Sequence, residues 1–193
     1  VSDEIHSDLV FEGHTHTPRW MVSESAARNS IVCMAPSKTF NIAGLSTSYT
    51  IIPNQEIRKK FDALLQTLHI TLGNIPGMVA LEAAYTHGRE WLQQFMAYVE
   101  ENYLFTEQFI ADHLPRIRVM KPEATFLVWL DFRDYGWNDR QLSEFLVRKA
   151  GVALNNGARF GFGGEGWQRL NIGCPRSLLK EGLERMALAF GHL

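Results

Sequence analysis

The sequence lacks several features that mark whole classes of protein. Its 193 residues contain only two cysteines, Cys33 and Cys174, which lie far apart and fit no zinc-binding or disulfide pattern. Such sparse cysteine favours a reducing, cytoplasmic setting. No apolar run approaches the ~20 residues that a membrane-spanning helix needs, and no signal peptide is visible.

The chain also lacks an excess of positive charge. It has 19 lysines and arginines against 21 acidic residues, for a net charge of -2. Domains that bind nucleic acid carry a basic surface, so we expect no nucleic-acid partner and no membrane partner. The first residue is Val1 rather than methionine, and "VSDEIHSDLV" resembles the end of a strand. We therefore expect a fragment of a longer chain.

Hydrophobic patterning divides the first half of the chain into strands followed by long helices. The apolar run "SIVCMA" (30–35) and the β-branched "STSYTIIP" (46–53) each predict a strand. Asn54 is expected to cap a helix, and "TLGNIPG" (71–77) interrupts the helical pattern. A helix from Met78 to about Asn102 follows, with a second helix or a bent continuation to about His113.

The second half alternates strands and helices. Strands are predicted at 116–121, 124–132, 152–155 and 168–173. Asn138 is expected to cap a helix, and Pro175 to occupy the first position of the last one. The organisation expected is an α/β domain remnant (1–76), a connecting helical segment (77–113) and a small α+β domain (114–193).

Two short stretches place reactive groups at predicted strand ends. "SDEIH" brings Asp3, Glu4 and His6 together, and "APSKTFNIAGL" (35–45) places Lys38 after the next strand. Ligands of open α/β sheets bind at the carboxyl ends of strands. A lysine can form a Schiff base with an aldehyde cofactor, while a carboxylate keeps a pyridine nitrogen protonated. Solvated acids and a plain surface lysine are the alternative interpretation.

Three stretches in order, "SDEIHSDLV", "APSKTFNIAGL" and "GWQRLNIGCPRSLL", resemble the motifs of fold-type I pyridoxal-phosphate (PLP) enzymes, the class I/II aminotransferase superfamily. The branch most similar is that of cystathionine β-lyase and cystalysin-like C–S lyases. The resemblance covers the whole chain as a C-terminal half. It implies an α/β fold, pyridoxal 5'-phosphate as cofactor, and a homodimer with active sites built across its interface.

The resemblance also implies roles for five residues. Lys38 matches the lysine that holds PLP covalently and later removes the substrate Cα proton, and Asp3 matches the aspartate that pairs with the pyridine nitrogen. His6 replaces a tyrosine that binds the cofactor's phenolic oxygen in many aminotransferases, and Ser37 matches a position near the phosphate. Arg169 matches the arginine that grips the substrate α-carboxylate with its planar fork. A loop histidine, a turn hydroxyl and an ion-paired arginine are the structural alternatives for the last three.

Three departures from the family pattern bear on the branch and on the site. Ala35 stands where many aminotransferases have a phosphate-binding serine, and "NIAGLSTSY" (41–49) lacks their phosphate-binding arginine. The C–S lyase branch commonly lacks that arginine too. Family members are much longer, and their first half carries the phosphate loop and the aromatic residue stacked on the ring. We therefore expect this chain to hold only part of the site.

The expected function is PLP-dependent C–S β-elimination. Cystathionine, cysteine or a related thioether would be cleaved to a thiol, pyruvate and ammonia. An aminotransferase is the first alternative, and an inactive C-terminal fragment or interaction module is the second. A metal-dependent hydrolase is a weaker reading, in which His6, His14 and His16 join Asp3 and Asp8 as ligands. All of its ligands would come from one short loop, so no metal is expected.

Overall fold

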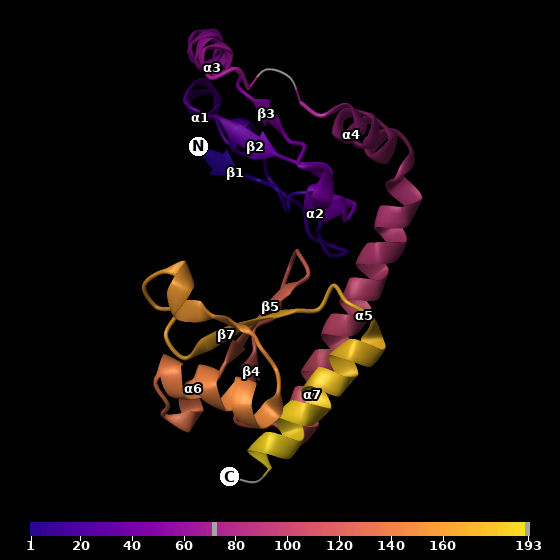
Figure 1. The fold of residues 1–193 in the computed structure, drawn as a ribbon, viewed down its shortest axis with the longest axis vertical. Helices are drawn as coiled ribbons and strands as arrows, with labels where there is room; N and C mark the ends of the chain where they lie inside the picture. Colours follow the sequence, from indigo (N-terminus) through magenta and orange to yellow (C-terminus); the bar gives the residue numbers. More distant parts are fainter. Residues whose placement is uncertain (71–72, 192–193) are drawn as a thin grey trace. The chain divides into compact units, whose positions relative to one another are not determined.

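The computed structural model describes residues 1–70 and 73–191 (Figure 1). The chain forms two compact units, Val1–Met96 and Ala97–Leu193. Helices α4 and α5 occupy most of the predicted connecting segment 77–113, and the three-part division itself stays a prediction. Within the described ranges, no helix is both long and apolar enough to cross a membrane.

The first unit is built on a three-stranded sheet in the order β1-β2-β3, with strands Ser2–Asp3, Val32–Met34 and Tyr49–Ile51. Strand β1 runs parallel to β2, with Asp3 opposite Cys33, and β3 is antiparallel to β2. The strands predicted at 30–35 and 46–53 are thus confirmed. Because β1 and β2 are parallel, their carboxyl ends lie at the same edge of the sheet.

The first unit also contains helices: η1 (Arg19–Met21), α1 (Glu24–Arg28), α2 (Pro36–Thr39), η2 (Ala43–Leu45), α3 (Gln55–Thr67), α4 (Ile75–His87) and the start of α5 (Arg89–His113). Asn54 caps α3 as predicted, since its side-chain oxygen accepts the backbone N–H groups of Glu56 and Ile57. The interruption predicted at 71–77 is wrong at its end, because Ile75, Pro76 and Gly77 form the first turn of α4 after the cap Asn74. Residues 71 and 72, where it would begin, lie outside the described part.

The helix expected to run unbroken from Met78 to Asn102 is wrong, because the chain breaks at Gly88 between α4 and α5. A Cβ at Gly88 would lie 2.4 Å from the Ala84 carbonyl oxygen and 2.5 Å from the Phe40 ring. Only glycine fits there. The helical periodicity does not reveal this close approach of the Phe40 ring to the break.

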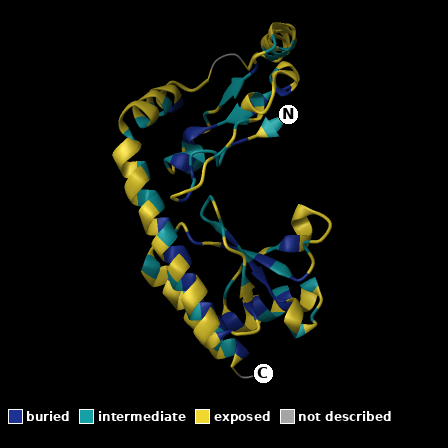
Figure 2. Cartoon of the chain, turned by 180° about the vertical axis from the view of Figure 1, so that it is seen from behind, coloured by how far each residue is buried: buried dark blue, intermediate teal, exposed yellow. Residues whose placement is uncertain are grey.

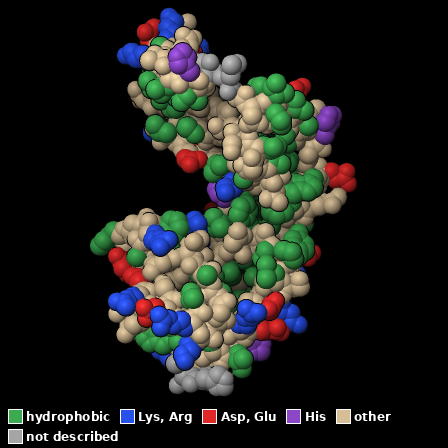
Figure 3. Space-filling view, in the orientation of Figure 1, with side chains coloured by type: hydrophobic (Ala, Val, Ile, Leu, Met, Phe, Trp, Pro, Cys, Tyr) green, Lys and Arg blue, Asp and Glu red, His purple; other side chains and the backbone are tan. Residues whose placement is uncertain are grey.

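Apolar side chains are exposed along α4 and the first part of α5 (Figure 3). They include Ile75, Met78, Val79 and Trp91, of which Ile75 is 72% exposed. Helix α4, with the sequence IPGMVALEAAYTH, has few polar residues, and they do not form a polar face along its whole length. Apolar side chains gathered on a helix surface in this way are usually buried against further polypeptide.

The second unit is an antiparallel sheet in the order β4-β5-β7-β6, with strands Arg118–Val119, Leu127–Asp131, Trp167–Asn171 and Asn155–Asn156. Its helices are η3 (Arg133–Tyr135), α6 (Asp139–Phe145), η4 (Leu146–Ala150), η5 (Gly157–Phe160) and α7 (Arg176–Phe190). Along β7, Gln168 and Leu170 are buried, whereas Arg169 between them points to the other face. The buried core of this unit includes side chains of the central strands β5 and β7 and of one side of α7 (Figure 2).

Local sequence signals in the second unit agree with its structure at one helix start and differ at a strand and at the last helix. Asn138 caps α6 in a complete capping box with Gln141, as expected. The strand predicted at 152–155 is wrong, because only Asn155 and Asn156 pair as β6. Gly151, at φ 64°, ends the preceding helix in the left-handed conformation, and the chain reaches the sheet four residues later. Pro175 is the cap of α7 rather than its first helical residue.

The connection from β7 to α7 is held by Asn102 of α5, which is fully buried. Its amide nitrogen donates to the carbonyl oxygens of Ile172 at 2.8 Å and Cys174 at 3.0 Å. Its side-chain oxygen accepts from Nε of Arg176 at 2.5 Å. Arg176 therefore has a structural role, and the strand that carries Arg169 ends at a fixed place.

Candidate active site

Lys38 lies in α2, the single helical turn that begins directly after β2. Pro36, at the first helical position, presets the backbone of that turn. Pro36 and Thr39 are buried, while Ser37 and Lys38 are half-buried. The turn closes by hydrogen bonds from the backbone N–H of Phe40 to Pro36 and of Ile42 to Ser37. Lys38 is thus presented at the sheet edge by a packed backbone.

Asp3 ends β1, the neighbouring parallel strand. Its Oδ1 accepts the backbone N–H of Ile5 at 3.2 Å, and the turn that follows contains the half-buried His6. Parallel pairing therefore brings the segments of Asp3, His6 and Lys38 to one edge of one sheet. The roles predicted for these residues stay predictions, as does that of Ser37.

Glu4 was grouped with Asp3 and His6 by sequence, but the structure separates them. Adjacent strand residues point to opposite faces, and Glu4 turns inward, with 7% of its surface exposed. It accepts hydrogen bonds from His16 at 2.9 Å, the backbone N–H of Arg19 at 2.9 Å and Ser2 at 3.0 Å. Glu4 therefore holds the loop that contains His16 in place. Both of its carboxylate oxygens are engaged in these hydrogen bonds.

The environment of Glu4 also sets its charge. Burial by itself raises the pKa of this carboxyl, but hydrogen bonds from His16, the Arg19 backbone and Ser2 outweigh burial and hold the pKa below its usual range. A carboxyl whose pKa is lower in the folded state stabilises the fold above its unfolded pKa. That stabilisation is lost as the pH falls through the folded pKa.

We expect Glu4→Gln to lower the free energy of unfolding by about 1–3 kcal/mol at neutral pH, because it removes a buried, charge-assisted acceptor. The difference from wild type should shrink below about pH 4, where the wild-type carboxyl also gains its proton. Denaturant unfolding over a pH series measures both effects. Glu12→Gln, on an exposed side chain of the same loop, is the control, and an equal loss in both variants would contradict the assignment.

The metal-hydrolase alternative finds no support in the geometry of the loop. His16 is bonded to Glu4, and Asp8 is bonded to Thr39. Across residues 1–70 and 73–191, no three or more His, Cys, Asp or Glu side chains come together as a metal site would require.

Sequence reasoning placed Asp8 only among those metal ligands and missed its true surroundings. Its carboxylate accepts a hydrogen bond from Thr39, the residue after Lys38, at 2.9 Å. It also accepts one from the hydroxyl of Tyr85 at 3.2 Å. These partners lie 31 and 77 residues away along the chain, so no local pattern could have indicated them.

Arg169, in the second unit, lies on β7 opposite Trp129 of β5. Its Nη2 donates to Asn155 Oδ1 at 3.2 Å, and its guanidinium lies 4.3 Å from the centre of the Phe160 ring. Its Nε is buried and has no hydrogen-bond partner within the part of the chain that the structure describes. A buried donor without an acceptor is costly, so this guanidinium is suited to an anion.

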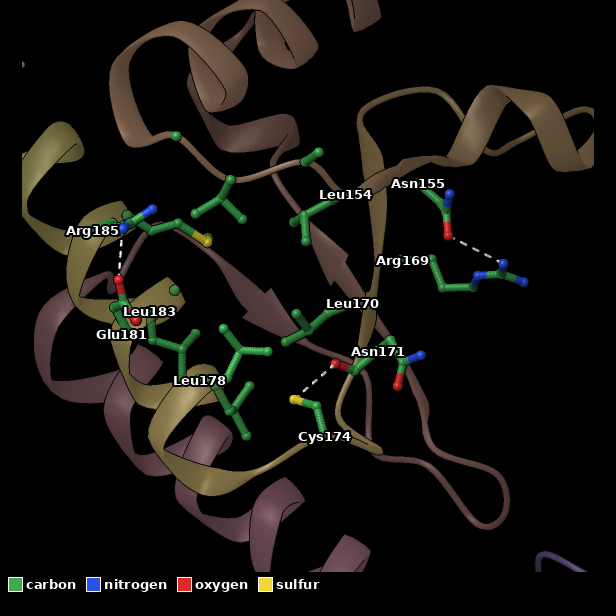
Figure 4. Close-up of a pocket in the computed structure, with 16 residues that line it drawn as sticks. Leu154, Asn155, Arg169, Leu170, Asn171, Cys174, Leu178, Glu181, Leu183 and Arg185 are labelled. Carbon is green, nitrogen blue, oxygen red and sulfur yellow. Dashed lines mark hydrogen bonds and ion pairs between the residues drawn. The ribbon is translucent and has the colours of Figure 1, made fainter. Parts of the chain in front are cut away.

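A hollow of about 470 Å³ lies beside Arg169 (Figure 4). Arg169 and Asn155 stand at one end of it, and the ion pair between Glu181 and Arg185 stands at the other. Its interior is mostly apolar, with Leu154, Leu170, Leu178, Leu183 and Met186 in the wall. Burial raises the pKa of the Cys174 thiol in this wall, which leaves it a poor nucleophile.

Phe160 lies in a loop whose two ends, Gly157 and Gly164, are in close contact. A Cβ on Gly157 would lie 2.2 Å from the carbonyl oxygen of Gly164, so the loop between them closes only with glycine at both positions. The ring of Trp129 meets Phe160 edge-on at 5.3 Å. The guanidinium plane of Arg169 is therefore fixed by Asn155 and Phe160 together.

The chain was compared with known proteins. The family model "Aminotransferase class I and II" matches residues 1–186. Cystathionine beta-lyase PatB of Bacillus subtilis is 46% identical over 189 residues, which cover 98% of this chain and 49% of PatB. Cystalysin from Treponema denticola, whose crystal structure contains pyridoxal 5'-phosphate, superposes with a TM-score of 0.92 at 35% identity over 99% of this chain and 48% of its own.

A third relative is the PLP-bound C–S lyase from Staphylococcus hominis, with a TM-score of 0.83 and 34% identity, covering 97% of this chain and 49% of that one. The chain spans about half the length of the curated relatives it matches. PLP is the cofactor of this family. The α/β fold class expected from the resemblance, that of fold-type I PLP enzymes, is confirmed. This chain belongs to the aminotransferase class I and II family, and its similarity extends to cystathionine β-lyases and cystalysin.

Proposed function

We propose that the protein carrying this sequence is a PLP-dependent C–S β-lyase. With one water molecule, it would cleave cystathionine, cysteine or a related thioether to a thiol, pyruvate and ammonia. The observation that carries the proposal is the parallel pairing of β1 with β2, which sets Asp3 and Lys38 at one sheet edge. The similarity to a cystathionine β-lyase over 98% of the chain favours this activity.

The residues at this edge fit the chemistry of PLP. The Lys38 amine would hold the aldehyde carbon, and the Asp3 carboxylate would pair with the protonated ring nitrogen. His6 would contact the ring oxygen, and Ser37 the phosphate. When bound, PLP supplies a sink for the electron pair released at the substrate Cα.

The chain's own residues perform two tasks before the carbon–sulfur bond breaks. Arg169 would bind the α-carboxylate of the substrate, because a guanidinium offers two parallel N–H donors to a carboxylate. The Lys38 amine would take the proton from Cα. The bond between Cβ and sulfur then breaks with both of its electrons going to sulfur, which leaves and is protonated to the thiol.

We further propose a homodimer in the cytoplasm. Exposed apolar side chains along α4 support burial against further polypeptide, since such a helix rarely faces water. Cys33 and Cys174 are both free thiols, which is consistent with a reducing compartment.

Pyruvate release tests the activity. The intact protein loaded with PLP is incubated with cystathionine and no keto acid, and pyruvate and free thiol are both quantified. We expect equal amounts of the two, formed over many turnovers. Dependence on an added keto acid would show an aminotransferase instead. Absence of PLP binding by the intact protein would favour the inert or interaction role.

A further inference from the structure

The Asp8 carboxylate joins three segments of the first unit that are distant in sequence. Its Oδ2 accepts from the Thr39 hydroxyl at 2.9 Å and from the Tyr85 hydroxyl at 3.2 Å. Asp8 belongs to the turn after β1 that also contains His6, Thr39 follows Lys38 in α2, and Tyr85 is on α4. One oxygen atom thus links the two segments expected to hold PLP and fastens both to a long helix.

The surroundings of these groups fix which one donates and which one accepts in each hydrogen bond. Thr39 is fully buried, so water does not compete for its hydroxyl. The Tyr49 hydroxyl donates to that of Tyr85 at 3.2 Å, which leaves the Tyr85 proton for Asp8. The Tyr85 ring meets Phe40 edge-on at 5.4 Å and Tyr49 at 5.9 Å. Burial, the bond from Tyr49 and the charge of Asp8 raise the Tyr85 pKa, so its hydroxyl keeps its proton.

The helix that carries Lys38 needs such external support. It has four residues, Pro36–Thr39, and a single helical turn is unstable by itself, because nucleating a helix costs more than one hydrogen bond returns. Its neighbour β2 fixes where the turn begins. The bond from Thr39 to Asp8 ties the last residue of the turn, directly after Lys38, to the segment that follows β1.

We propose that Asp8 is a positioning residue for Lys38. Through Thr39 it sets the orientation of the α2 turn relative to the turn that contains His6, and Tyr85 holds the Asp8 carboxylate in place. This role rests on the proposed function of Lys38 as the PLP-binding amine. Small displacements of a reacting group are expensive in rate and affinity, so losing the link should be measurable in PLP binding itself.

The test compares Asp8→Ala, Thr39→Val and the double variant in the intact protein. PLP dissociation constants come from absorbance titration, and hydrogen exchange of the 35–42 peptide is followed without PLP. Each single variant is expected to bind PLP about 5- to 20-fold more weakly, because each loses one hydrogen bond to a charged group. The double variant should be no weaker than the worse single one, because both remove the same link. Exchange of the 35–42 peptide should become faster in all three.

Matched variants separate this role from general destabilisation. Asp62→Ala, at an exposed carboxylate on α3, should leave both readouts at wild-type values. Tyr85→Phe should weaken PLP binding by less than Asp8→Ala does, because the Thr39 bond survives. If Asp8→Ala does not fold, Asp8→Asn and Thr39→Val carry the comparison.

The positioning role of Asp8 would be overturned if Asp8→Ala kept the wild-type PLP affinity and hydrogen exchange. Fully additive losses in the double variant would overturn it too. Neither result would overturn the proposed function. Borohydride reduction of the wild type, followed by peptide mapping, tests the underlying assumption. If the wild type carries no trapped PLP on Lys38, both the proposed function and this role are overturned, so the two failures are distinguishable.

Discussion

Replacing Lys38 with alanine is expected to reduce pyruvate formation from cystathionine by at least about 10³-fold. The amine is assigned two tasks, the covalent hold on PLP and removal of the Cα proton, and a general base alone contributes about 10²- to 10⁴-fold. The fold should survive, because the turn is held by the buried Pro36 and Thr39 rather than by the half-buried lysine. Steady-state pyruvate assays and borohydride trapping with peptide mapping measure the two tasks separately.

Lys60→Ala is the matched control for this experiment. Lys60 is exposed on α3 in the same unit, so its removal should change neither activity nor trapping. An adduct on another lysine in the wild type would contradict the assignment. So would Lys38→Ala activity within tenfold of wild type.

Replacing Arg169 with alanine is expected to lower kcat/KM for the amino-acid substrate by about 10²- to 10⁴-fold, which corresponds to two charge-assisted hydrogen bonds of about 1.5–3 kcal/mol each. PLP affinity should change little, because the cofactor residues lie on other segments. Arg169→Lys should recover only a small part of the loss, since an ammonium does not offer two parallel donors. Binding of a substrate analogue, followed by absorbance, separates affinity from turnover.

Arg185 provides a control within the same hollow. It stands at the opposite end from Arg169 and pairs with Glu181 at 2.6 Å, so Arg185→Ala should leave kcat/KM near the wild-type value. If Arg169 were only a structural residue packed on Phe160, Arg169→Ala would lower the free energy of unfolding and leave KM unchanged. That result would remove Arg169 from the substrate site.

Features that depend on neighbours along the chain were predictable from the sequence. Asn54 and Asn138 cap their helices through backbone groups two or three residues away, and such short-range bonds form wherever the local pattern permits. The apolar run at 30–35 predicts the strand before Lys38. The order of three motifs indicated the family, and the family model and the similar relatives confirm it.

Other features were decided only by the tertiary structure. The chain separates α4 from α5 at Gly88, where a Cβ would overlap the Phe40 ring, and Glu4 turns inward to bind His16, although Asp3 beside it lies at the surface. The sequence by itself determined the family, the α/β class and the identity of Lys38, Asp3 and Arg169 as candidates. The assembly of Asp8 with Thr39 and Tyr85 required the folded chain, because hydrogen bonds across 31 and 77 residues form only after packing has brought their partners together.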